Sequence, residues 1–141
     1  MFRTRFFDSH CIAIHYPPET SISLSDLFEG RVVFVWDELM DPETVRDLLG
    51  RYVAMAPAFV TGRARRAERE GAKKRFRLVE EEGAITQGLV LIGLSEEELT
   101  RLDDHQRAPI HLARQKEKVR IGDLERVVEI YLSSGAYLGE E

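Results

Sequence analysis

The sequence predicts an α+β fold, built as a curved and mainly antiparallel sheet or small barrel with two main helices packed against it. Candidate strands outnumber candidate helices, and most of them follow one another along the chain. The two helices stand at separate places in the sequence. The length of 141 residues suits one domain, and a chain of this size can bury a core without covalent or metal staples.

We expect a single domain over residues 1–141 that has three parts. An N-terminal extension, a core and a polar tail are expected at residues 1–29, 30–132 and 133–141. In the extension, residues 11–15 have the composition of a strand, which two prolines close. Residues 23–29 predict one short helical turn that ends at Gly30.

Residues 31–51 predict a buried strand, a tight loop and a capped helix. The run of β-branched and aromatic residues Val32–Trp36 is typical of a strand that is covered on both faces. Asp41 suits the helix N-cap, the proline after it suits the first helical position, and Gly50 suits the end. A ligand is sought in the loop between strand and helix, because a helix N-terminus presents free backbone N–H groups.

The middle of the chain predicts two more strands around a strongly basic segment. Residues 58–61 indicate a strand with Gly62 as a bulge, and Glu80–Gly83 indicate a turn before the longest strand, at 84–94. Eight basic side chains lie within residues 63–77, with Phe76 as the one aromatic among them. A charged hairpin whose arginines pair with nearby glutamates is therefore favoured over a nucleic-acid surface.

The last third predicts a helix and a closing hairpin. Ser95 and Glu98 have the spacing of a capping box, and the helix that they start runs to about Arg107. A rotation of about 100° per residue places Gln106 on the inward face of this helix. The hairpin strands are expected at residues 111–121 and 126–132.

Composition limits the location and partners of the protein. The net charge of −5 argues against a protein devoted to nucleic acid. The single cysteine, Cys11, excludes an intramolecular disulfide and fits a reducing compartment. The sequence has neither a signal peptide nor an apolar run of membrane-spanning length. We expect a cytoplasmic protein without a membrane partner or a cofactor, and the sequence leaves its oligomeric state open.

Three motifs in a fixed order carry a resemblance. They are Leu39–Pro42 after the first core strand, Gly88 within the long strand, and Leu94–Asp103 at the start of the second helix. Over about residues 31–132 the chain resembles the γ-glutamylcyclotransferase-like superfamily, which includes the AIG2-like proteins. The resemblance implies a small, mixed β-barrel with helices packed against it. It also implies a site where loop N–H groups hold the α-carboxylate of a γ-glutamyl amine, while a glutamate moves the proton as the amine cyclises to 5-oxoproline.

The chain departs from the family pattern at both parts of that site. Trp36-Asp37-Glu38-Leu39 stands where active members carry Tyr-Gly-Ser/Thr-Leu, and Gln106 stands in the position of the catalytic glutamate. A glutamine has no titratable proton near neutral pH, so it cannot act as a general base. Asp37 and Glu38 repel a substrate carboxylate if they face the pocket. We therefore expect the standard cyclotransferase reaction to be absent.

Three functions remain open. In the first, the chain is a small-molecule-binding or regulatory module whose ligand contacts Trp36, Asp37, Glu38, Leu39 and Gln106. In the second, it is an enzyme on a different amine or γ-glutamyl-type substrate that uses Glu38 or Asp37 as the acid/base, with His105 as a substitute base. In the third, it is a structural partner whose residues 1–29 form an interface. A carboxylate that approaches Gln106 with a raised pKa favours the enzyme, whereas two solvent-facing side chains oppose it.

Two groups of residues were considered as metal ligands. The first is an acidic cluster that would suit an amine or a divalent cation, namely Asp37, Glu38, Asp41, Asp103, Asp104 and His105. The second is the set His10, Cys11 and His15. Neither group has a known ligand spacing, and strand alternation places His10 and Cys11 on opposite faces. Capping, solvated positions and ordinary strand packing explain both groups more simply, so we expect no metal site.

Overall fold

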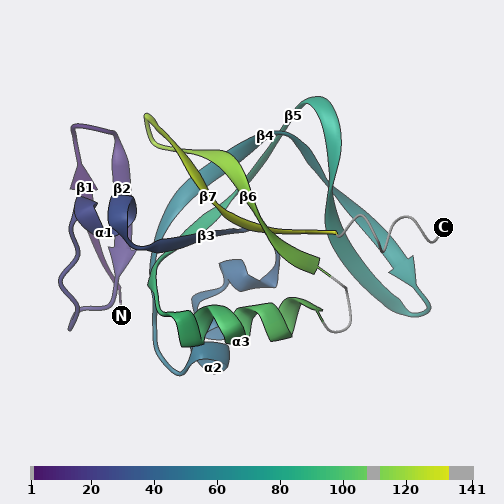
Figure 1. The fold of residues 1–141 in the computed structure, drawn as a ribbon, viewed down its shortest axis with the longest axis horizontal. Coiled ribbons are helices and arrows are strands. Elements are labelled where there is room, and N and C mark those ends of the chain that lie inside the picture. The colour runs from purple at the N-terminus through teal and green to yellow at the C-terminus, as the bar shows by residue number, and fades with distance from the viewer. Residues whose placement is uncertain (1, 108–111, 134–141) are drawn as a thin grey trace.

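The computed structural model describes residues 2–107 and 112–133 and contains seven strands, three α-helices and one 3₁₀ turn (Figure 1). The strands are β1 (Arg3–Phe7), β2 (Ile12–Tyr16), β3 (Arg31–Val35), β4 (Ala54–Glu70), β5 (Lys73–Leu94), β6 (Leu112–Ile121) and β7 (Leu124–Ser133). The helices are α1 (Leu24–Glu29), α2 (Pro42–Leu49) and α3 (Glu96–Arg107), and the 3₁₀ turn η1 covers Glu38–Met40. The first residue of the hairpin strand predicted at 111–121 and the predicted tail beyond Ser133 lie outside the described residues.

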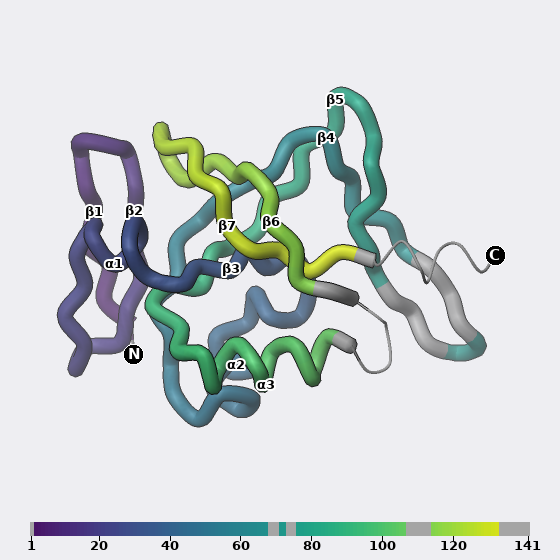
Figure 2. Tube along the Cα trace, in the orientation of Figure 1, coloured from purple at the N-terminus to yellow at the C-terminus, as the bar shows by residue number. Residues whose placement is uncertain are grey.

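Five strands close into a barrel. The strand order is β1-β2-β4-β5-β3-β7-β6, and a further pairing of β4 with β6 closes the ring from β4 to β6. Most pairs are antiparallel, but β3 runs parallel to β7. The helices α2 and α3 pack against each other at one side of this barrel (Figure 2). The predicted α+β architecture, a mixed and mainly antiparallel barrel with two main helices, is confirmed.

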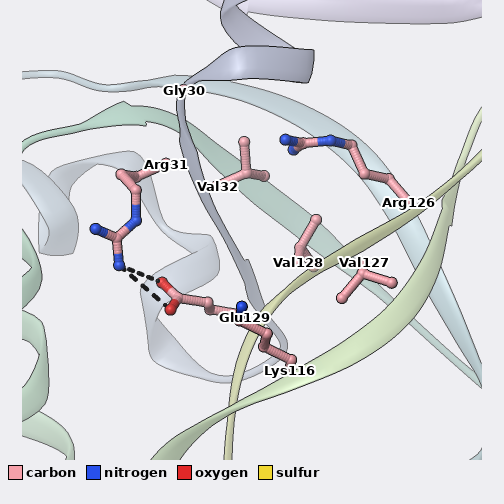
Figure 3. Close-up of a pocket in the computed structure, with 8 residues that line it drawn as sticks. All are labelled: Gly30, Arg31, Val32, Lys116, Arg126, Val127, Val128 and Glu129. Atoms are coloured by element: carbon pink, nitrogen blue, oxygen red, sulfur yellow. Dashed lines mark hydrogen bonds and ion pairs between the residues drawn. The ribbon is translucent and has the colours of Figure 1, made fainter.

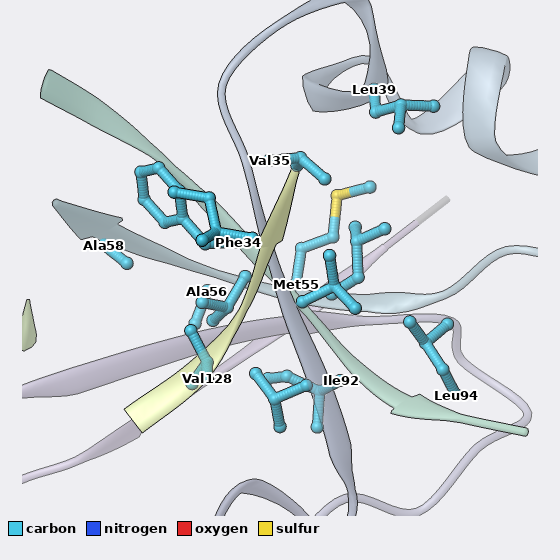
Figure 4. Close-up of a cluster of buried hydrophobic side chains, with 14 of the residues drawn as sticks. Phe34, Val35, Leu39, Met55, Ala56, Ala58, Ile92, Leu94 and Val128 are labelled. Carbon is cyan, nitrogen blue, oxygen red and sulfur yellow. The ribbon is translucent and has the colours of Figure 1, made fainter. Parts of the chain in front are cut away.

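The strand β3 runs through the centre of the core, as its composition predicts. Val33 and Phe34 are fully buried, and the side chains of β3 pack with those of β4, β5 and β7 (Figure 4). Gly88 on β5 makes this packing close, because a Cβ at that position would lie 2.3 Å from the carbonyl oxygen of Val35. A glycine is therefore required where β5 crosses the end of β3.

The prediction of a turn at Glu80–Gly83 is wrong. Strand β5 continues through this segment as part of a 22-residue strand, and it pairs with β4 on both sides of an irregularity. Thr61 pairs with Ile85 and Arg63 pairs with Glu80, so four residues of β5 stand opposite Gly62 alone. Gly83 has a φ of +84°, which bends the strand without reversing it. Sequence alone does not separate a glycine that bends a strand from one that ends it.

The N-terminal residues pack onto the barrel. Strand β1, which was not predicted, pairs with β2 as a hairpin, and β2 joins β4 through His15 and Met55. Ile12, Ile14 and Leu27 are buried in the same core cluster as β3. Cys11 has a φ of +53° and lies in the turn before β2, so the prediction of a strand from residue 11 is wrong by one residue.

Both main helices begin as their capping residues predict. The Asp41 side chain accepts the Glu43 N–H at the start of α2, and Gly50 ends that helix in the left-handed conformation. At α3, Glu98 N–H donates to Ser95 Oγ and Ser95 N–H donates to Glu98 Oε1, at 3.1 and 2.9 Å. None of the described helices is long and apolar enough to cross a membrane.

Candidate functional site

The candidate site lies where β3 ends and the last turns of α3 meet the 3₁₀ turn η1. Trp36 directly follows β3 and is buried, and its indole N–H donates to the backbone oxygen of Tyr131 on β7 at 3.3 Å. Leu39 is fully buried and packs into the core (Figure 4). These two side chains anchor the loop from both ends, so the residues between them are held against α3.

Asp37 turns inward and makes two hydrogen bonds. Its Oδ1 accepts the backbone N–H of Leu39 at 3.1 Å, and its Oδ2 accepts the side-chain amide of Gln106 at 3.3 Å. Gln106 is only 2% exposed, in agreement with the inward direction predicted from helical periodicity. Burial raises the pKa of Asp37 and nearby Glu38 adds to the rise, while the hydrogen bonds from Leu39 and Gln106 oppose it. The site therefore holds a carboxylate with an increased affinity for a proton.

Glu38 turns outward. Its Oε2 lies 2.7 Å from Nε2 of His105, one turn from the end of α3, and both side chains remain partly accessible to solvent. The pair links η1 to α3 beside the buried contact of Asp37 with Gln106. Asp37, Glu38, His105 and Gln106 thus form two neighbouring pairs, one buried and one partly exposed.

An ionic network fixes the part of α3 that carries Gln106. Asp103 accepts the hydroxyl of Tyr131 at 2.6 Å and the guanidinium of Arg114 at 3.0 and 3.1 Å. Arg114 also donates to Glu129 at 2.8 Å, and Glu129 accepts from Arg31 at 3.1 Å. The prediction that Asp103 is a solvated helix residue is wrong, because Asp103 lies in this network. Its partners Arg114 and Tyr131 are 11 and 28 residues away along the sequence, so no local sequence pattern predicts these contacts.

Neither predicted metal candidate gathers into a ligand set. Within residues 2–107 and 112–133, no group of three or more histidine, cysteine, aspartate or glutamate side chains is arranged to hold a metal ion. Asp41 caps α2, and His15 bonds to Thr4 through Nδ1 at 2.7 Å. The ring of His10 packs against that of Phe28.

Two arginines of the basic segment, Arg63 and Arg66, pair with glutamates. Arg66 forms an ion pair with Glu81 across the β4–β5 ribbon. Arg63 pairs with Glu117 on β6 at 3.0 Å, a partner that the sequence analysis did not name. Arg65 donates to the backbone oxygen of Gln87 at 3.3 Å and lies 3.9 Å from the sulfur of Met40. The base of the basic segment therefore borders the candidate site.

A family model described as "Gamma-glutamyl cyclotransferase, AIG2-like" matches residues 33–140. The chain belongs to this family. The match includes the η1 loop, α3 and the closing hairpin, and it leaves out β1, β2 and α1. The family resemblance inferred from Leu39–Pro42, Gly88 and Leu94–Asp103 is confirmed.

Solved structures share the fold of this family at low sequence identity. A protein from Arabidopsis thaliana is 23% identical, with a TM-score of 0.64 over 74% of this chain and 69% of its own. A second Arabidopsis thaliana protein is 24% identical, with a TM-score of 0.62 over 73% of this chain and 61% of its own. A structure titled "Gamma-glutamyl cyclotransferase" is 14% identical, with a TM-score of 0.60 over 75% of this chain and 68% of its own. No curated protein sequence matches the chain.

Proposed function

We propose that this member of the γ-glutamylcyclotransferase, AIG2-like family binds a small molecule at the η1 loop and does not carry out the standard cyclisation to 5-oxoproline. The contact between Asp37 and Gln106 carries the proposal. By the family resemblance, these residues stand where active members have a glycine of the anion-holding loop and the catalytic glutamate. In this chain the two positions bond to each other.

The loop is chemically unsuited to the α-carboxylate of a γ-glutamyl amine. The N–H of Leu39 already donates to Asp37, so the protein's own carboxylate takes up an N–H group of the loop. Asp37 also places a carboxylate beside any incoming carboxylate, and such repulsion is strong where water is excluded, whereas Glu38 lies outward against His105. The Asp37 carboxylate attracts an amine. The ligand class that fits is therefore a small amine without a neighbouring carboxylate.

This chain also lacks the titratable side chain that the family uses for proton transfer. The Gln106 amide donates to Asp37 and has no titratable proton near neutral pH. Loss of a general acid/base costs about 10²–10⁴-fold in rate. Family members that cyclise γ-glutamyl amines depend on a glutamate at this position. Glu98 is the one carboxylate among the buried residues described for α3, and it is bonded to Arg51 and to the Ser95 N–H at the start of the helix.

The experiment is a release assay combined with a binding measurement. We expect the wild-type chain to release no 5-oxoproline from γ-glutamylalanine or γ-glutamyl propylamide, and free propylamine to shift the backbone N–H resonances of residues 37–40. The double variant Asp37→Gly/Gln106→Glu restores both family groups and should begin to release 5-oxoproline, whereas Gln106→Glu alone should not, because Asp37 still occupies the loop.

A wild-type rate typical of enzymes in this assay would show that the proposal is wrong. If propylamine does not shift the backbone N–H resonances of residues 37–40, the proposed binding of an amine at the η1 loop is wrong. The double variant must retain cooperative urea unfolding for its result to count, and Arg46→Gln on the exposed side of α2 serves as a control that leaves the loop intact.

A second candidate is an enzyme on a different amine or γ-glutamyl-type substrate, with Asp37 as the acid/base. One observation favours it: Asp37 lies against Gln106 and burial raises its pKa, which is the behaviour expected of a proton-transfer group. Glu38 is exposed and bonded to His105, so it is the weaker candidate. Amine release that disappears with Asp37→Asn and survives with Glu38→Gln would favour this enzyme over the binding module.

A further inference from the structure

A pocket of about 360 Å³ opens at the end of β3 that is farthest from the η1 loop (Figure 3). Its walls come from β3, β6 and β7: Gly30, Arg31, Val32, Lys116, Arg126, Val127, Val128 and Glu129. The volume lies in the range of roughly 300–1,000 Å³ that is typical of small-molecule sites. The pocket shares no residue with the Asp37 and Gln106 contact.

The pocket exists because two parallel strands separate. Strands β3 and β7 pair only at Val33 with Glu129 and Phe34 with Ile130. On the N-terminal side of these pairs, Arg31 and Val32 pair with β5, while the corresponding residues of β7 pair with β6. The two strands therefore diverge, and the space between them is bounded by strand edges that have no partner strand among the described residues.

The charge of the lining is predominantly positive. Three side chains, Arg31, Lys116 and Arg126, carry positive charge, and Glu129 is the one acid among the lining residues. The Glu129 carboxylate accepts hydrogen bonds from both Arg31 and Arg114, at 3.1 and 2.8 Å, and Arg31 also forms an ion pair with Glu96. The excess positive charge of the lining therefore comes from Arg126 and Lys116. A protein with a net charge of −5 thus presents a locally cationic pocket at this point.

Arg126 is the side chain best placed to bind a ligand. Its guanidinium extends across the pocket toward Val32 and donates to the backbone oxygen of Phe28 (Figure 3). Among the described side chains, no carboxylate pairs with Arg126 or with Lys116. A partly buried guanidinium is costly to desolvate, and an oxyanion ligand would offset that cost through charge-assisted hydrogen bonds.

The remaining wall is apolar. Val32 and Val128 are buried in the core, and Val127 is 55% exposed at the rim. Inorganic phosphate alone would leave Val127 without a contact. A ligand that carries an apolar group next to its charge would cover Val127 and gain from removing that surface from water.

We propose that this pocket binds a small organic oxyanion, with the phosphate or carboxylate at the Arg126 guanidinium, additional attraction from the positive charge of Lys116, and an apolar group against Val127 at the rim. This second site is independent of the function proposed for the η1 loop. It lies on the opposite end of β3 and takes a ligand of opposite charge, so the success or failure of one site leaves the other standing.

The test is an NMR titration at constant ionic strength with phenyl phosphate, benzoate, inorganic phosphate and phenol. We expect phenyl phosphate or benzoate to shift the backbone N–H resonances of residues 30–32 and 126–129 in a saturable manner. The ratio of their dissociation constants then identifies the head group. Inorganic phosphate and phenol should each bind at least tenfold more weakly than whichever of phenyl phosphate and benzoate binds more tightly. Phenol that binds as tightly as both acids would overturn the proposal.

Variants distinguish specific binding in this pocket from nonspecific attraction of an anion to positive charge on the protein surface. Arg126→Gln should weaken binding at least tenfold, whereas Arg46→Gln on the distant helix α2 should change it less than twofold. If Arg126→Gln disrupts the contact with Phe28 and unfolds the protein, Lys116→Gln and Val127→Glu test the proposal instead. Both positions are exposed, so the fold should tolerate the substitutions. Val127→Glu adds a carboxylate at the rim that should repel the oxyanion. Equal effects of all variants, or shifts spread evenly over the surface, would contradict the proposal.

Discussion

At the residue scale, the candidate site depends on an aspartate and a glutamine that replace a glycine and a glutamate of the family pattern. The sequence predicted the inward direction of Gln106, because helical periodicity fixes the face of a residue within α3. It did not predict the direction of Asp37, because the rotation of one side chain in a tight turn depends on the N–H of Leu39 that it caps. The difference between Asp37 and Glu38, which are adjacent and chemically alike, is therefore visible only in three dimensions.

The raised pKa of Asp37 makes the stability of the protein depend on pH. Burial of the carboxylate is the largest cause of the rise, so the folded state binds the proton more tightly than the unfolded chain, whose aspartates have a pKa of about 3.9. The resulting stabilisation is complete below that value and is lost as the pH rises through the folded pKa. We expect Asp37→Asn to gain in unfolding free energy relative to wild type as the pH rises from about 4 to 7.

Urea unfolding at a series of pH values measures this difference, and the ¹³C resonance of the Asp37 carboxyl gives the folded pKa directly. A difference between Asp37→Asn and wild type that stays constant from pH 4 to 7, or a carboxyl midpoint at or below 3.9, would contradict the expectation.

At the element scale, the position of α3 is set by charged and polar contacts as well as by its apolar face. Its N-terminus was predictable, because a capping box is a local pattern and the structure contains both of its hydrogen bonds. Its attachment to β6 and β7 through Asp103 was not, because Arg114 and Tyr131 come from strands later in the chain. The extent of β4 and β5 was also beyond local patterns, since Gly62 and Gly83 produce a bend that resembles a turn in sequence.

Removal of one hydroxyl tests the attachment of α3. Tyr131 is buried and its hydroxyl donates to Asp103, and both burial and the Asp103 carboxylate raise the pKa of Tyr131, so it remains a donor at neutral pH. We expect Tyr131→Phe to lower the unfolding free energy by about 1–2 kcal/mol, measured by urea denaturation. The matched control is Tyr52→Phe, which removes a surface hydroxyl that donates to Glu43 at 2.8 Å. Equal losses of unfolding free energy in the two variants would mean that burial of the hydrogen bond between Tyr131 and Asp103 adds nothing to its contribution to stability.

At the scale of the whole molecule, the sequence predicted the barrel and its helices but not how the N-terminal residues attach to them. The barrel was accessible because its strands are apolar runs with recognisable ends and its motifs occur in the family order. The attachment was not, because β1 is short, polar and exposed along most of its length. The family match begins at residue 33, yet Ile12, Ile14 and Leu27 complete the core.

Two substitutions in the N-terminal hairpin test this attachment. Ile14 is fully buried, so Ile14→Ala should lower the unfolding free energy by about 2–5 kcal/mol, a large part of the 5–15 kcal/mol that is typical of a domain. Phe6, on the same hairpin, is 57% exposed, and Phe6→Ala should change the unfolding free energy by less than about 0.5 kcal/mol. Denaturant midpoints of both variants give the comparison. Similar small effects would indicate that the hairpin is dispensable for folding, as an interface segment would be.

The parallel pairing of β3 with β7 has a consequence for the order in which the chain folds during synthesis. Strand β3 is made early, whereas its neighbour β7 is the last strand among the described residues. Until β7 has emerged from the ribosome, the edge of β3 at Val33 and Phe34 has no strand to pair with on that side. An unpaired apolar edge is a site of association between nascent chains. The nascent chain therefore needs protection by chaperones most between the synthesis of β5 and that of β7. Premature termination within β6 would leave a product that is prone to aggregate.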